Sequence, residues 1–215
     1  MYELYIYDDI GPDWMGMVSA QYVNAEIAKA KNEPITVRIN SPGGDVFEGQ
    51  AIYNALARRG NITIEIDALA ASAASYIAMA GDKIRIAENA MVMIHNAWTM
   101  TMGDKHEHQK RLELLDKVDS IIAETYQKRI GDKSTPDKVR EWMDAETWMT
   151  AKEAVERGFA TEISQPMKVS ACLKEGRYKN APQAMLNNGV TQREIFRDVR
   201  ISQAKIKTRL TNAMR

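Results

Sequence analysis

A serine and a histidine in the first half of the chain could together carry out nucleophilic catalysis. Ser72 lies in DALAASAASYIAMAG, where a strand-like run gives way to small residues and a helix is expected to begin. At such a junction, backbone N–H groups and the helix dipole favour negative charge that develops on a hydroxyl. The alternative is an N-cap serine in a closely packed helix. Ser75, in the same segment, is the second candidate nucleophile.

His95 is the candidate general base. It follows the apolar run MVMI and precedes a loop, so a strand would present its imidazole from a rigid element. A buried histidine with a structural role is the alternative. Trp98 and the methionines near it could line a substrate groove beside His95 or could serve in packing.

Two adjacent glycines are the third candidate feature. In INSPGGDVFEG, an expected strand ends and Pro42, Gly43 and Gly44 permit a tight turn before a helix. Without a Cβ, glycines let backbone N–H groups approach a substrate closely, as an oxyanion hole requires. The same PGG is also found in ordinary turns.

The elements that must position these residues alternate between strand and helix. Strands are expected at 2–7, 35–39, 62–67, 83–86 and 91–94. Helices are expected at about 14–31, 47–59, 104–130, 136–143 and 150–158. This alternation predicts an α/β fold with a mostly parallel sheet and right-handed crossovers.

Apolar stripes predict which helix faces are buried. In the first helix the stripe is Met15, Val18, Tyr22 and Ala25. In the long helix, for which Asp104 is the expected cap, the stripe is Leu115, Val118, Ile122 and Tyr126. A helix of this length on a small domain commonly packs against a neighbouring subunit, and packing on its own sheet is the alternative.

Composition divides the chain into three parts. Residues 1–163 form one domain, and residues 164–190, which contain prolines, glycines and asparagines without a sustained period, read as a linker. Residues 191–215 read as a basic amphipathic helix. This tail is expected to be solvated or to dock on a partner, because it almost lacks the aromatic residues of nucleic-acid and membrane binders.

Charge and composition exclude several classes of protein. The chain has 29 Lys and Arg against 29 Asp and Glu, and 45% of its residues are hydrophobic, which is typical of a globular protein and disfavours a polyanion binder. No signal peptide or membrane span is visible, and the single cysteine, Cys172, fits a reducing cytoplasm. His106 and His108 lack zincin spacing, and GDKST lacks the start of a phosphate loop, so neither a metal nor a cofactor is expected.

Along the chain, the motifs RINSPGG, AASAASY and MIH follow one another in this order. Their order and spacing resemble the Clp protease proteolytic subunit family, a group of self-compartmentalising serine peptidases. The resemblance covers about 35–163 and ends in WMTAKEAVERGFATEI. It implies a Clp protease/crotonase-like fold of repeated β-β-α units with a long, protruding oligomerisation helix. It also implies that Ser72 attacks a peptide carbonyl after His95 takes its proton, and that Gly43, Gly44 and Ala73 form the oxyanion and substrate-binding positions.

The sequence departs from the family pattern in three places. The family's catalytic aspartate falls on Glu146 in DAETWMT, and Asp144 could substitute from a neighbouring position. The proline usually found two residues after the histidine is replaced by Ala97. The chain starts almost directly at its first expected strand, which argues against the axial loops that dock an unfoldase ATPase.

The short start, Glu146 in place of the aspartate and the helical tail most resemble the phage and prophage branch of the family, whose members are associated with processing of capsid or scaffold proteins. The leading hypothesis is a serine endopeptidase that acts on polypeptides inside a homo-oligomeric ring, a heptamer or paired rings. The alternatives are a catalytically silent ring-forming scaffold protein and an acyl-CoA enzyme of the crotonase fold. No nucleic-acid or membrane partner is expected.

Overall fold

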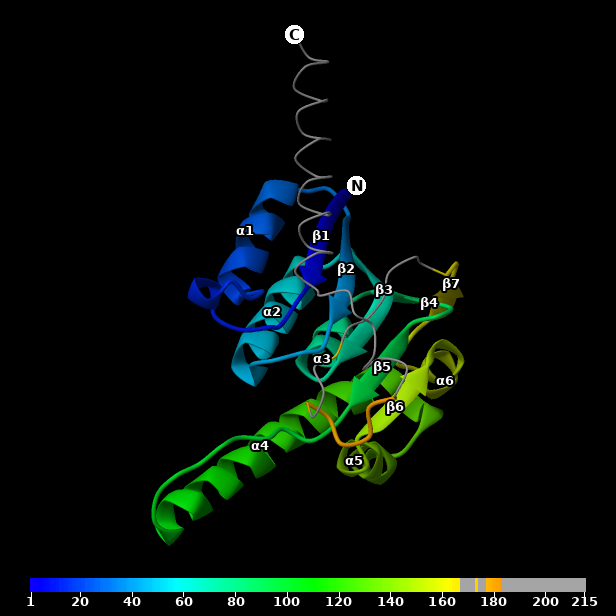
Figure 1. The fold of residues 1–215 in the computed structure, drawn as a ribbon. Helices are drawn as coiled ribbons and strands as arrows, with labels where there is room; N and C mark the ends of the chain where they lie inside the picture. The colour runs from blue at the N-terminus through cyan, green and yellow to red at the C-terminus, as the bar shows by residue number, and fades with distance from the viewer. Residues whose placement is uncertain (167–172, 174–176, 183–215) are drawn as a thin grey trace.

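The computed structural model describes residues 1–166, 173 and 177–182, so the expected tail 191–215 lies outside the described residues. Seven strands form one sheet: β1 (Tyr2–Tyr7), β2 (Ile35–Ser41), β3 (Ile62–Ala71), β4 (Lys83–Ala87), β5 (Met91–Ile94), β6 (Thr147–Thr150) and β7 (Glu162–Ser164). The α-helices are α1 (Ala20–Ala30), α2 (Val46–Arg59), α3 (Ala73–Ala78), α4 (Lys105–Ile130), α5 (Pro136–Asp144) and α6 (Ala151–Arg157). Single 3-10 turns lie at Asp13–Met15 and Gly131–Lys133. Figure 1 shows the arrangement.

The sheet branches at β3. Its main path is β1-β2-β3-β4-β7, and every neighbouring pair on this path is parallel. The first half of β3 pairs with β4, and its last residues pair with β5 instead. Strand β5 then pairs antiparallel with β6. The expected α/β class with a mostly parallel sheet is therefore confirmed.

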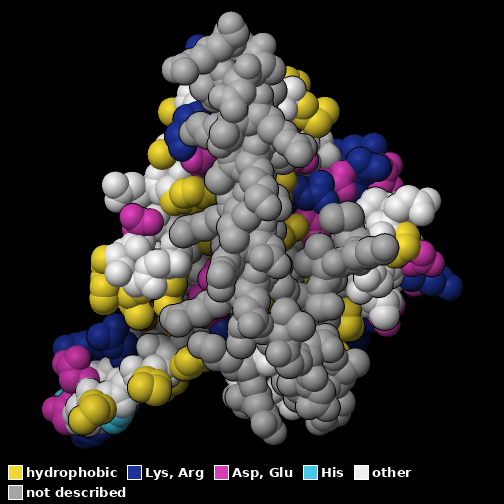
Figure 2. Space-filling view, turned by 45° about the horizontal axis from the view of Figure 1, so that its top comes forward, with side chains coloured by type: hydrophobic (Ala, Val, Ile, Leu, Met, Phe, Trp, Pro, Cys, Tyr) yellow, Lys and Arg dark blue, Asp and Glu magenta, His cyan; other side chains and the backbone are white. Residues whose placement is uncertain are grey.

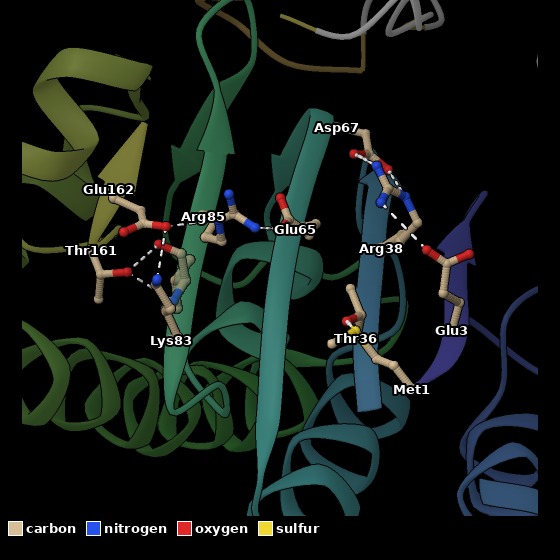
Figure 3. Close-up of polar contacts among 11 residues, drawn as sticks. Met1, Glu3, Thr36, Arg38, Glu65, Asp67, Lys83, Arg85, Thr161 and Glu162 are labelled. Carbon is tan, nitrogen blue, oxygen red and sulfur yellow. Dashed lines mark hydrogen bonds and ion pairs between the residues drawn. The ribbon is translucent and has the colours of Figure 1, made fainter. Parts of the chain in front are cut away.

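The two faces of the sheet differ in polarity because side chains alternate along each strand. The inward positions of β1 to β4 are isoleucine, leucine and valine, and they pack with α1, α2 and α3 into one apolar core. The opposite face carries a row of charged residues that are paired across neighbouring strands (Figure 3). In this row Arg38 Nε donates to Asp67 Oδ2 at 2.9 Å, and Arg85 pairs with Glu65 and Glu162.

The first helix is shorter than the sequence pattern predicts. A strand-like bridge from Ile10 to Val18 precedes it, and the hydroxyl of Ser19 caps α1 by accepting from Tyr22 N. The predicted apolar stripe is wrong except for Val18, because Met15, Tyr22 and Ala25 are exposed. The buried residues of α1 are Val23 and Ala30. Residue spacing alone could not show that a turn and a bridge interrupt the helical period.

Helix α4 extends well beyond the rest of the molecule (Figure 1). It begins where Asp104 Oδ1 accepts from His106 N and Glu107 N. Its second half is anchored by Val118, Ile122 and Tyr126, as the stripe predicts, whereas Leu115 is only half-buried. The first half of the helix is exposed. Figure 2 shows side chains of both charge signs on the protruding end. Among the helices in the described ranges, none is both long and apolar enough to cross a bilayer.

Candidate active site

The ends of β3 and β5 bring the candidate serine and histidine together. Ala71 is the register partner of Met93, and Ser72 N donates to Met93 O at 3.0 Å. Ser72 and His95 therefore follow directly from paired strand ends, which a parallel sheet places at the same edge. Ser72 and His95 are separated in the sequence, and the pairing of β3 with β5 brings them together.

Ser72 adopts a strained backbone conformation at the turn from β3 into α3. Its φ is +55°, a region that costs a non-glycine residue about 1 to 3 kcal/mol. The side chain makes no hydrogen bond to the helix that it precedes, so it does not act as a cap. Instead, Ser72 Oγ lies 2.8 Å from His95 Nε2. This contact is the one a serine and its general base require.

Ser75, the second candidate nucleophile, has a different environment. It is fully buried, and its Oγ donates to Ser72 O at 2.6 Å and lies 2.8 Å from the hydroxyl of Tyr126. These contacts hold the first turn of α3 against α4. Ser75 therefore supports the turn that carries Ser72 and is closed to a substrate.

The two glycines after β2 lie against the same turn. Ser41 is the register partner of Ala70, so Gly43 reaches the level of Ser72. A Cβ on Gly43 would lie 2.7 Å from Ser72 Cβ and 3.0 Å from Ala73 N. Only a glycine allows this close approach between the two backbones.

The N–H of Gly44 is directed away from Ile10, its partner in an isolated β-bridge. In the bridge between Ile10 and Gly44, Ile10 N donates to Gly43 O, and Asp45 N donates to Ile10 O. In the described part of the chain, neither Gly44 N nor Ala73 N has an assigned acceptor. Gly44 and Ala73 line the same cleft as Ser72, and backbone donors at such positions can stabilise an oxyanion.

Replacing Gly43 by alanine is expected to lower both stability and the reactivity of Ser72. The new Cβ would lie 2.5 Å from Ala71 O, and φ at this position is +86°. Gly16→Ala is the matched control, because Gly16 has a φ of +74° and nothing within 4 Å of the added Cβ. Thermal unfolding should show the conformational cost of about 1 to 2 kcal/mol in the control and a larger loss in Gly43→Ala. Equal losses would contradict a role for close packing at Gly43.

The register of β5 with β6 determines which acid faces the histidine. Ile94 pairs with Thr147, so His95 and Glu146 are the next opposed positions. Asp144 lies at the end of α5, and its Oδ1 accepts from Asn96 Nδ2 at 2.7 Å. Of the two acids, Glu146 is the one whose charge raises the pKa of His95. Its carboxylate accepts from Lys179 N and Asn180 N, and among the described contacts no hydrogen bond joins it to His95.

Burial lowers the pKa of His95 below its usual value of 6.5. The negative charge of Glu146 opposes this shift, and the positive charge of Arg177 adds to it. The imidazole is therefore neutral near pH 7, as a general base for Ser72 must be.

The described residues 177–180 also reach this site, which the sequence did not indicate. The ring of Tyr178 lies edge-on to His95 with centroids 5.4 Å apart, and its hydroxyl donates to Pro42 O. Arg177 Nη2 donates to Gly43 O at 3.1 Å. The only signal in KEGRYKN was an aromatic residue between basic ones, in a stretch with the composition of a linker.

A cleft of about 510 Å³ opens beside Ser72 and His95. Its floor is apolar and includes Tyr76, Val118 and Ile122. Trp98 and Met100 line its rim and are 68% and 88% exposed, so the structure favours the groove interpretation of these residues over packing.

Ala97 has a role that the usual proline could not fill. Its N–H donates to Asp119 Oδ1 at 2.7 Å, which ties the loop after His95 to α4. Proline has no backbone N–H to donate.

Among the described residues, no group of three or more His, Cys, Asp or Glu is arranged to hold a metal ion.

Comparison with known proteins agrees with this geometry. The model of the Clp protease family matches residues 3–167. The chain belongs to the Clp protease family. It is 30% identical to an ATP-dependent Clp protease proteolytic subunit of Chlorella vulgaris, over 69% of this chain and 73% of the relative. It is 31% identical to proteolytic subunit 1 of Leifsonia xyli, over 72% of this chain and 77% of that protein.

A third relative has the same level of similarity. ATP-dependent Clp protease proteolytic subunit 2 of Tropheryma whipplei is 31% identical over 61% of this chain and 73% of the relative. The match to the family model ends at residue 167, so Arg177 and Tyr178 lie beyond the matched residues. The resemblance inferred from RINSPGG, AASAASY and MIH is confirmed.

Proposed function

We propose that this member of the Clp protease family is a serine endopeptidase. Ser72 is the nucleophile, His95 the general base and Glu146 the acid that orients the imidazole. The observation that carries the proposal is the 2.8 Å separation of Ser72 Oγ and His95 Nε2 at the mouth of the apolar cleft. A crotonase-type acyl-CoA enzyme would have no use for this pair.

The reaction follows from the positions of these groups. His95 Nε2 takes the proton of Ser72 as Oγ attacks the peptide carbonyl, and the carbonyl oxygen becomes an oxyanion held by Gly44 N and Ala73 N. His95 then gives its proton to the leaving amine, which departs and leaves an acyl-enzyme. A water molecule, deprotonated by His95, attacks the ester and releases the second product.

The cleft supports a polypeptide substrate with an apolar side chain near the cleaved bond. Tyr76, Val118 and Ile122 form a floor that would bury such a side chain, at about 25 cal/mol per Å² of apolar surface. A peptide in the cleft would place its carbonyl between Ser72 and the Gly44 N–H.

The protruding part of α4 supports assembly into a ring. Leu112 and Leu114 are 56% and 37% exposed there, and an identical subunit would cover them. The family resemblance favours a heptamer or paired rings, and the phage and prophage likeness favours a capsid or scaffold protein as substrate. A reducing cytoplasm fits the single cysteine. Neither an ATPase, a nucleic acid nor a membrane is part of the proposal.

The test is the pH dependence of labelling by a fluorophosphonate, with the modified residue located by mass spectrometry. We expect the label on Ser72. Because burial lowers the pKa of His95 from 6.5, the labelling rate should be constant from pH 8 to pH 7 and should fall to half only below pH 6.5.

Two results would contradict the proposal. A label on any other serine would exclude Ser72 as the nucleophile, and a half-point above pH 6.5 would contradict a buried, neutral base. Assembled protein without any label, at a pH where the imidazole is neutral, would favour the silent scaffold protein. Light scattering after size-exclusion chromatography shows whether the sample is assembled.

A further inference from the structure

A short segment beyond the residues matched by the family model contacts each part of the candidate site. The family match ends at residue 167, yet the described residues 177–180 contact the strand ends that carry the glycine turn, the histidine and the acid. The catalytic proposal above does not use these contacts. They come from consecutive residues, so one segment makes all of them.

The backbone of this segment holds the carboxylate of Glu146. Lys179 N donates to Glu146 Oε2 at 3.1 Å, and Asn180 N donates to Oε1 at 2.6 Å. Asn180 Nδ2 also donates to Ala145 O at 3.0 Å. Glu146 itself has a φ of +48°, and residues in this region persist where surrounding contacts hold them. The two N–H groups restrict the rotation of a carboxylate that is one methylene longer than aspartate.

Tyr178 fills the space between the histidine and the acid-bearing strand. Its ring lies edge-on to Trp148 at 5.7 Å as well as to His95, and only 9% of the residue is exposed. Its hydroxyl donates to Pro42 O. The ring therefore covers one side of the imidazole and shields it from water.

Arg177 fastens the segment to the glycine turn. Its guanidinium pairs with Asp9 in the loop after β1 and donates to Gly43 O. Such charge-assisted bonds have well-defined geometry. Loss of this residue would loosen the segment at its first contact.

We propose that residues 177–180 are a positioning element of the active site, in which Tyr178 orients His95 and the N–H groups of Lys179 and Asn180 orient Glu146. This inference rests on the proposed serine peptidase function. The Ser72–His95 contact is formed and the 510 Å³ cleft is open with the segment in place, so the segment lines the site without filling it. Removal of the segment should therefore weaken catalysis, whereas removal of an inhibitory plug would increase it.

The charged and titratable groups around His95 give the sign of the effect. Burial lowers the pKa of the imidazole, Glu146 raises it and Arg177 lowers it. Tyr178 and the Ser72 hydroxyl face it as neutral groups near pH 7, since burial raises the pKa of the Tyr178 phenol. Removing the Tyr178 ring would expose the imidazole to water, and the pKa of His95 would rise toward 6.5.

The experiment compares full-length wild-type protein with Tyr178→Ala and Tyr178→Phe. The second-order rate of fluorophosphonate labelling is measured from pH 5 to pH 8. Tyr178→Ala should label about tenfold more slowly at pH 8, with its half-point shifted upward. Tyr178→Phe keeps the ring, so its labelling rate should stay within about threefold of wild type and its half-point should be the wild-type pH.

A second pair of variants tests the backbone contact. Asn180→Pro removes the N–H that donates to Glu146. Asn180→Ala keeps this N–H and loses only the side-chain bond to Ala145 O, so labelling should fall further in the proline variant than in the alanine variant. Circular dichroism and thermal unfolding identify variants that do not fold. If Tyr178→Ala does not fold, the comparison of Asn180→Pro with Asn180→Ala tests the positioning role. Labelling at the wild-type rate or faster, with an unchanged half-point, would overturn the positioning role.

Failure of the catalytic proposal would be recognised separately. Wild-type protein that takes no label at any pH would contradict the serine peptidase. The pKa of His95 can still be measured in protein with ¹³C-labelled histidine, since the chain has 3 histidines. An upward shift of that pKa in Tyr178→Ala, reversed in Tyr178→Phe, would support the positioning role without any catalytic readout. An unchanged pKa would overturn it.

Discussion

Replacing Ser72 by alanine is expected to reduce peptide hydrolysis by at least about 10⁴-fold, because the hydroxyl that contacts His95 Nε2 at 2.8 Å is lost. The change removes one oxygen atom and its hydrogen bond to the imidazole. Stability should change by less than about 1 kcal/mol, since Ser72 makes no cap bond that alanine would lose. Hydrolysis of a fluorogenic peptide and thermal unfolding measure the two effects.

Ser75→Ala is the matched control for this prediction. It removes a hydroxyl from α3, the helix that Ser72 precedes, but that hydroxyl contacts Ser72 O and Tyr126 rather than His95. We expect it to lower stability by about 1 to 3 kcal/mol, since a buried donor is lost and Tyr126 keeps an unpaired hydroxyl. Hydrolysis below the melting temperature should stay within about tenfold of wild type. The reverse pattern, with Ser75→Ala inactive and Ser72→Ala active, would exchange the two assignments.

Glu146→Gln is expected to reduce kcat/KM by a factor on the order of 10² to 10⁴, the range seen when the orienting acid of such a triad loses its charge. The carboxamide cannot accept from both Lys179 N and Asn180 N as the carboxylate does. One of its N–H groups would face a backbone donor, and the side chain would turn. Steady-state kinetics on a peptide substrate measures the loss.

Asp144→Asn is the corresponding control, and it also tests the alternative acid. Asp144 accepts from Asn96 on the surface, and its charge does not act on the pKa of His95. We expect kcat/KM to change by less than about threefold. If Asp144→Asn were the damaging change and Glu146→Gln the mild one, the register of β5 with β6 would be a misleading guide to the acid.

Local sequence patterns predicted the strands with sustained apolar runs and the long helix with a clear cap and apolar stripe. β-branched runs predicted the first five strands, and the observed β3 and β2 extend a few residues further. The long helix was predicted with its cap and its buried stripe of Val118, Ile122 and Tyr126. The first helix was predicted too long, since Met15 fits a helical period but lies in the 3-10 turn before α1. Tyr22 lies within α1, but its side chain is exposed. Strands β6 and β7 have four and three residues and were too short to show a period.

The sequence by itself determined the family, the α/β class and the candidates Ser72, His95 and Glu146, because these depend on residue type and order. Which side chains meet was decided by the tertiary structure. The branching of β3 places β5 beside Ser72, and the antiparallel β6 places Glu146 opposite His95. Tyr178 reaches His95 from more than eighty positions away, at a 5.4 Å centroid distance. Contacts of this kind arise from strand pairing and chain path, so no local pattern could indicate them.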